Sequence, residues 1–421
     1  MRGIVDRTSE SPTRLDDTEH ERSTRGFRSY LVSFVVSRLA LQIAQVAVGW
    51  HIYAITHQVF DLGLIGLVLF VPSLILWPVA GHAADRFDRR AVVAAMFGVE
   101  ALVAIAFGVL AMTGVRDLTP YLVALLASGI GRAFLQPALA SLLPTIVPRE
   151  RLLQAQATAN SIRELVVIAG PALGGVLITL GSAIAFYTSG VLMLLSTALL
   201  WTVPSVRDEP REREPLTWTS ILAGVRFIRD NRIIAGAILL DLFAVLFGGA
   251  TALLPVYAQS ILHVGPLGLG ILRSAPAVGA GLCAAYLARR RLVRGVGRTL
   301  FVCVAGFGLA TIVFGLSRSV WVSVGALIVL GGFDMVSVVI RQGLVQLNTP
   351  NGLRGRVSAV SSMFVGASNE LGAFESGSVA ALVGTVGSVV AGGVATIAIV
   401  AISRFAFPDL WHAEKLDQEA A

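Results

Sequence analysis

The chain is almost without lysine. Of its 33 lysine and arginine residues, only Lys415 is a lysine, and it stands in the C-terminal tail. The phosphate-binding loop of ATPases has the pattern Gly-x-x-x-x-Gly-Lys and needs a lysine beside the phosphates. The sequence therefore excludes a pump that hydrolyses ATP on this chain.

Cysteine and catalytic motifs are equally scarce. The two cysteines, Cys283 and Cys303, stand in apolar runs and cannot build a disulfide framework or a Cys-pair metal site. Neither His-Glu-x-x-His nor Gly-x-Ser-x-Gly occurs, and the six histidines show no metal-binding spacing. We therefore expect no enzymatic activity, no metal and no cofactor.

Charge is the third thing the chain has little of. Only 14% of its residues are charged, against about a quarter in soluble domains, while 55% are hydrophobic and the mean hydropathy is +0.77. An apolar run of about 20 residues spans a bilayer. The sequence predicts an all-α polytopic membrane protein with twelve such spans, at 29–55, 62–81, 91–113, 120–142, 158–180, 182–203, 232–258, 266–288, 299–317, 321–346, 358–383 and 387–406.

The polar remainder divides the chain. We expect a disordered tail over 1–26, a first six-helix half over 27–203, a polar linker over 204–231, a second half over 232–407 and a tail over 408–421. Within the linker, the stretch from Trp218 to Arg229 favours a short amphipathic helix at the membrane surface.

Arginine distribution predicts the orientation. The N-terminal tail, the linker and alternate loops hold most of the arginines, whereas the opposite loops hold only Arg116 and Arg318. Positively charged loops face the cytoplasm, so both termini and the linker are expected there. Nucleic-acid binding is not favoured, because the charge is spread over loops rather than gathered on one face.

The two halves look alike. Gly66 and Pro72 recur as Gly270 and Pro276, and Gly170 and Gly175 recur as Gly372 and Gly377, at nearly the same offset. Transporters built from internal repeats hold their substrate near the midplane, between the repeats. One chain containing both halves predicts a monomer.

The loop after the second span carries a family resemblance. Gly81-x-x-x-Asp85-Arg86-x-x-Arg89-Arg90 resembles the signature loop of the major facilitator superfamily. The resemblance implies a gating role, in which Asp85 caps span eleven across the halves and Gly81 permits close helix approach. Arg86, Arg89 and Arg90 would add salt bridges and contacts to lipid phosphates, or would serve topology alone.

One branch of that superfamily matches further. Residues 47–56, Leu62-Gly63-Leu64-Ile65-Gly66-Leu67 and Gly131-Arg132-Ala133-Phe134-x-x-Pro137-Ala138 are similar to the enterobactin-exporter-like family of bacterial efflux transporters. The resemblance implies proton-driven export of a siderophore, drug or other small molecule through the inner membrane.

A proline-glycine stretch in span five adds a hint of direction. Gly170-Pro171-Ala172-Leu173-Gly174-Gly175 resembles the antiporter motif of exporters in the superfamily. The alternative is ordinary packing, because glycine and proline are common in membrane helices.

Charges at membrane depth are the sharpest functional candidates. Each costs at least about 2.5–3.5 kcal/mol at the centre of a helix unless it is paired or hydrated. Arg38 and Arg132 fall near the midplane of the first half, and the repeat relates them to Asp241 and Asp334 in the second. We predict a charge set across the cavity, in which protonation of either aspartate shifts the balance between open states. Static ion pairing of the halves is the alternative.

Other polar residues are weaker candidates. Glu164 is expected at the cavity mouth or at the surface, and Glu100 against protein or headgroups. Arg273 is placed near the outer end of its span, where it would only reach toward the surface. Substrate-binding candidates are Arg341, for an anionic group, and Gln42, Gln45, Gln136, Asn369 and Glu370.

The sequence thus predicts a secondary active exporter whose partners are a small-molecule substrate, protons and membrane lipids. A proton-coupled importer or facilitator of the same fold remains an alternative. A transporter-like sensor without turnover is the alternative from a different class.

Overall fold

The structure is a computed structural model that describes residues 12–203, 218–289 and 295–416. Within those ranges, the side chains of residues 12–25, 77–78, 81–86, 149 and 218–221 lie outside the description. Of the described residues, nearly all are helical and none forms a strand.

Six long helices form the first part of the chain. Each contains a long apolar run, and two of them end at turn glycines, Gly114 in the left-handed region after α3 and Gly181 between α5 and α6. These helices are α1 (Pro12–Thr56), α2 (Val59–Arg86), α3 (Arg89–Thr113), α4 (Thr119–Ile146), α5 (Arg149–Leu180) and α6 (Ser182–Trp201).

The second part begins with the linker helix α7 (Trp218–Asp230), which confirms the helix expected from Trp218 to Arg229. Its span α8 breaks after Phe247 into short 3-10, α and π turns that end at Ile261. The elements are α8 (Arg232–Phe247), η1 (Ala250–Leu253), α9 (Leu254–Val256), η2 (Tyr257–Ile261), α10 (Gly265–Arg289), α11 (Val296–Leu316), α12 (Val320–Leu347), α13 (Arg354–Val383), α14 (Thr385–Ala406) and α15 (Pro408–Trp411).

Eleven helical stretches of the described chain are long and apolar enough to cross a membrane. Eleven of the twelve predicted spans coincide with them. The exception is α13, whose serines, Asn369, Glu370 and Glu375 lower its hydropathy. Large apolar side chains such as Trp321 and Leu382 stand exposed on the outside of the helices, as a lipid-facing surface requires.

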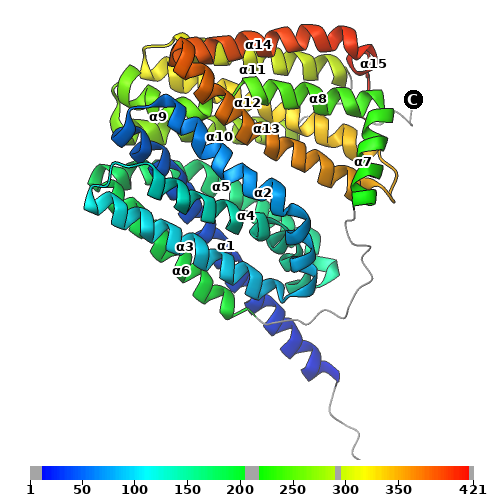
Figure 1. Cartoon of the computed structure of the whole chain (residues 1–421). Coiled ribbons are helices and arrows are strands. Elements are labelled where there is room, and N and C mark those ends of the chain that lie inside the picture. The colour runs from blue at the N-terminus through cyan, green and yellow to red at the C-terminus, as the bar shows by residue number, and fades with distance from the viewer. Residues whose placement is uncertain (1–11, 204–217, 290–294, 417–421) are drawn as a thin grey trace, which may run out of the picture.

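The helices gather in two bundles (Figure 1). In the first, α3 and α1 both pack on α6, and α2 packs on α4. In the second, α10 and α11 pack on α12, and α11 also packs on α14. The bundles meet mainly where α2 lies on α13 and α5 lies on α10.

These contacts gather toward one end of the helices. We call it the joined end; it holds the turns around residues 57–58 and 262–264, and the opposite end, beside α7, is the linker end. Across the joined end the Tyr53 hydroxyl bonds to the Ser260 hydroxyl at 2.9 Å, and Gln259 Nε2 donates to the Trp50 carbonyl at 3.1 Å. In Figure 1 the two bundles diverge from there toward α7.

The expectation of a disordered tail is wrong for residues 12–26, which are the first turns of α1. Between Pro12 and Gly26 no residue breaks a helix, and glutamates and arginines favour one, so the span continues outward. Residues 1–11 lie outside the described chain. At the other end, Leu410 is fully buried and the Leu416 carbonyl accepts a bond from Asn348 Nδ2 at 2.8 Å, so the tail packs against the second bundle.

Candidate functional site

A cavity of about 390 Å³ lies between the bundles, and we call it the central cavity. The first bundle contributes Gln42 from α1 and Glu164 from α5. The second contributes Arg273, Asp334 and Asn369, from α10, α12 and α13. Polar groups from both bundles therefore face one space, as a ligand site between helices requires.

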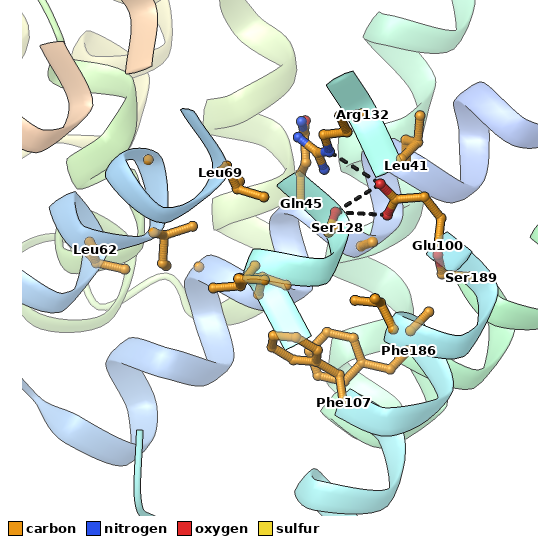
Figure 2. A pocket seen from close by; sticks show the side chains of 18 of the residues that line it. Leu41, Gln45, Leu62, Leu69, Glu100, Phe107, Ser128, Arg132, Phe186 and Ser189 are labelled. Carbon is orange, nitrogen blue, oxygen red and sulfur yellow. Dashed lines mark hydrogen bonds and ion pairs between the residues drawn. The ribbon is translucent and has the colours of Figure 1, made fainter. Parts of the chain in front are cut away.

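A smaller cavity of about 170 Å³, the side cavity, extends into the first bundle (Figure 2). Its walls are mostly apolar, with Leu62 and Leu69 on α2, Phe107 on α3 and Phe186 on α6. Arg273 and Ala373 line both cavities, so the two adjoin at these residues.

Figure 2 shows a charged cluster in the wall of the side cavity. The Glu100 carboxylate on α3 accepts bonds from the Ser128 hydroxyl at 2.8 and 2.9 Å, and Arg132 Nε lies 3.4 Å from its Oε1. Both partners stand on α4, four residues apart and hence on one face. Glu100 is buried, so it faces protein rather than headgroups.

A second cluster lies in the second bundle. Asp241 Oδ2 on α8 is 2.8 Å from Arg341 Nη1 on α12, and both side chains are buried. Arg341 also acts electrostatically on Asp334, which stands two turns away on the same helix. Two acids therefore share one arginine, and Asp334 is the one that lines the central cavity.

The structure does not bring the predicted cross-cavity charge set together. Arg132 pairs with Glu100 and Asp241 pairs with Arg341, each inside its own bundle. Arg38 lies with its guanidinium carbon 5.3 Å from the centre of the Phe34 ring, also within the first bundle. The physical reason is distance: a partner on an adjacent helix is in contact range, whereas the cavity separates residues on opposite bundles.

Arg341, which we expected to receive an anionic substrate group, also pairs within its own bundle. Its bond to Asp241 already satisfies the charge, although the residue also borders a polar groove between α12 and α13. Glu164 lines the central cavity and is 2.9 Å from Arg163, and both are about half exposed. It thus stands at the cavity rather than deep in lipid.

The substrate-binding candidates divide into two sets. Gln42 and Asn369 line the central cavity, and Gln45 and Glu370 line the side cavity. Gln136 is exposed and lines neither cavity.

The proposed gating loop is described in part. The side chains of Gly81, Asp85 and Arg86 lie outside the described residues. Arg90 Nη1 donates to the Val203 carbonyl, and the guanidinium carbon lies 4.8 Å from the Trp201 ring centre. Arg90 therefore packs against the C-terminal end of α6. Arg89 Nη1 is 3.5 Å from the Ser141 carbonyl. Both arginines thus bind within the first bundle.

The glycines of the antiporter-type motif sit at helix crossings. A Cβ on Gly170 would lie 2.5 Å from Gln42 Cβ, and one on Gly174 would lie 3.3 Å from Ile43 Cα. A Cβ on Gly175 would lie 2.6 Å from the Pro266 carbonyl oxygen on α10, in the other bundle. Pro171 keeps its carbonyl beside Gly270 of α10. The motif therefore joins the two bundles as well as packing the first.

Comparison with known proteins bears on this arrangement. The sequence pattern of the family described as "Transmembrane secretion effector" matches residues 22–420. The chain belongs to this family. It is a multi-pass membrane transporter of the major facilitator superfamily, and not an enzyme.

Curated relatives agree with the family. An enterobactin exporter of Citrobacter koseri is 29% identical over 346 residues, covering 79% of this chain and 80% of its own. An enterobactin exporter of Escherichia coli is 26% identical over 396 residues, covering 92% of each. The solved structure of a bacterial homologue of the lysosomal transporter Spinster, inward-facing and occupied, has a TM-score of 0.70 at 13% identity, covering 96% of this chain and 99% of that one.

Two residues that line this transporter's cavities, Glu100 and Arg273, could not be recognised as such from the sequence. Glu100 gave a signal, a lone acid in an apolar span, but its partner could not be chosen without knowing that α3 lies on α4. Arg273 was placed too near the end of its span. It stands eight residues into α10, about 12 Å along the helix, and lines both cavities.

Proposed function

We propose that the chain is a proton-coupled exporter of a siderophore-like small molecule, working by alternating access in the bacterial inner membrane. The observation that carries the proposal is the central cavity between the two bundles, with the Asp334 carboxylate in its wall. The enterobactin exporters among its relatives support the substrate class.

We propose twelve spans, arranged as two pseudo-symmetric six-helix halves over 27–203 and 232–407. The helix α13 would supply the span that completes the set of twelve, as the eleventh in chain order. Its 30 residues measure about 45 Å, enough to cross a bilayer. Its Asn369 and Glu370 line the cavities, which explains its low hydropathy without removing it from the membrane.

We propose that the linker end faces the cytoplasm, together with both termini. The loops at that end carry the arginines, as in Arg89, Arg90 and Arg289, whereas Arg116 and Arg318 are at the joined end. The conformation described would then be closed to the outside. We also propose that the chain works as a monomer surrounded by membrane lipids and that it does not bind nucleic acid.

Proton coupling is assigned to Asp334 rather than to Asp241. Asp241 is held by Arg341 in a buried ion pair that needs no proton. Asp334 shares the same arginine, so the three groups carry one uncompensated negative charge when both acids are ionised. When Asp334 takes up a proton from the cavity, that negative charge is removed. When Asp334 releases the proton, the charge returns. Such a change can bias two conformations only if they hold the charge differently.

The test is enterobactin uptake into inside-out membrane vesicles, with and without an acid-inside pH gradient. The wild-type chain should accumulate enterobactin when the gradient is imposed. Asp334→Asn should lower gradient-driven accumulation by about tenfold and leave exchange of labelled for unlabelled enterobactin intact, because exchange needs no net proton movement. Arg318→Gln, an exposed arginine outside the cavities, is the matched control.

Three results would contradict the proposal. Equal uptake by the wild type with and without the gradient would make the chain a facilitator. Gradient-driven movement out of the same vesicles would make it an importer. Binding without any movement would favour a sensor.

A further inference from the structure

The guanidinium of Arg273 stands where the two cavities meet. It reaches this point from α10 of the second bundle and lines the apolar side cavity as well as the central cavity. Nothing in the function proposed above uses this charge, since proton coupling rests on Asp334.

Arg273 differs from the other arginines at membrane depth. Arg132, Arg163 and Arg341 each have a carboxylate within 4 Å, and Arg38 lies over an aromatic ring. Among the described residues, Arg273 has no hydrogen bond and no ion pair. Its electrostatic partner is Glu370, which is beyond ion-pair distance.

Glu370 is attracted electrostatically by two arginines. It attracts Arg132 of the first bundle as well as Arg273 of the second, and it makes contact with neither. Its carboxylate lies against α2, 3.3 Å from where a Cβ on Gly66 would stand. Glu370 therefore balances the charge of Arg273 from a distance and leaves the donors of its guanidinium open toward the cavities.

An open guanidinium is built for an oxyanion. Its planar fork donates two parallel bonds to a carboxylate or a similar acidic group, and such charge-assisted bonds are the strong ones. The adjoining wall of Leu62, Ile65 and Leu69 offers an apolar surface next to it. Asp334 and Glu164 line the central cavity, and their negative charges would repel the acidic group of a ligand on that side.

We propose that Arg273 binds the acidic group of an amphipathic organic anion, whose apolar body occupies the side cavity. The inference rests on the proposed function, because it names the substrate class of the same cavities. The incoming acid takes the place of Glu370 as the counter-charge of Arg273. Glu370 is then left with Arg132, across the boundary between the bundles.

The test is equilibrium binding of two probes of nearly equal shape, 2-naphthoate and its uncharged analogue 2-naphthamide. The full chain is purified into lipid nanodiscs, and empty nanodiscs give the background. The wild type should bind naphthoate at least about tenfold more tightly than naphthamide, since hydrogen bonds to an ionised group are stronger than those to a neutral amide. Arg273→Gln should bind both equally, and Arg273→Lys should keep part of the preference.

The outcomes separate this inference from the proposed function. The binding measurement uses no gradient, so a chain that fails to accumulate enterobactin can still show the charge preference. A preference unchanged in Arg273→Gln overturns the inference, and so does a wild type without any preference. Loss of the preference in Arg318→Gln, the exposed control, also overturns it. A folded Arg273→Gln variant is shown by unchanged naphthamide binding.

Discussion

Arg341→Met is expected to destabilise the folded chain by about 3–5 kcal/mol, because it leaves Asp241 buried beside Asp334 with no cation. The pair that it breaks is short, 2.8 Å, and both side chains are almost fully covered. Removing one member of a buried pair costs far more than the pair contributes, since the remaining charge has no water to solvate it.

The double variant Asp241→Leu with Arg341→Met gives the contrasting result. It removes both charges, so most of the lost stability should return. Unfolding by denaturant in mixed micelles, followed by tryptophan fluorescence, measures both variants, with Arg318→Met as the exposed control. A double variant no more stable than Arg341→Met would contradict the account of this pair.

Gly175→Val is expected to open the joined end. The new side chain would meet backbone atoms of α10, namely the Pro266 carbonyl oxygen at 2.6 Å and Gly270 Cα at 3.1 Å, and backbone cannot rotate away. Overpacking of this kind costs about 1–3 kcal/mol. Because the cost falls on the state in which α5 touches α10, the equilibrium should move about 5- to 150-fold toward separated bundles.

Spin labels report the shift. Cysteines at Gln58 and Leu267, exposed residues of opposite bundles at the joined end, carry the labels in a background of Cys283→Ser and Cys303→Ser. Pulsed dipolar spectroscopy should show longer distances in Gly175→Val than in the parent. Gly98→Val is the control, because no atom lies within 4 Å of its added Cβ. Equal distances in all three would mean that the crossing does not hold the end closed.

The glycine crossing between α5 and α10 has a repeat-related counterpart between α13 and α2. Gly175 meets Gly270 between α5 and α10, and the repeat-related Gly377 meets Gly63 between α13 and α2. From apolar runs and composition the sequence predicted the linker helix and twelve spans, and eleven of those spans coincide with helices of membrane-spanning length. It could do so because a bilayer fixes the length and polarity of each span.

The sequence could not predict which groups pair with the buried charges. Depth along a helix follows from counting residues, but the direction of a side chain depends on the rotation of its helix against a neighbour. Arg132 and Asp334 stand near the middle of α4 and α12, yet the side chain of the first contacts Glu100 and that of the second lines the central cavity. The same limit hid Arg273, because the cavities exist only once the two bundles are assembled.

The most direct test of proton-coupled export is to follow enterobactin and proton movement together in inside-out vesicles of the wild-type chain. Proton-coupled export predicts that adding enterobactin makes an acid-inside gradient decay faster, as protons leave in exchange, and that Asp334→Asn lowers this acceleration about tenfold. Enterobactin entry at full rate without any accompanying loss of the gradient would contradict it.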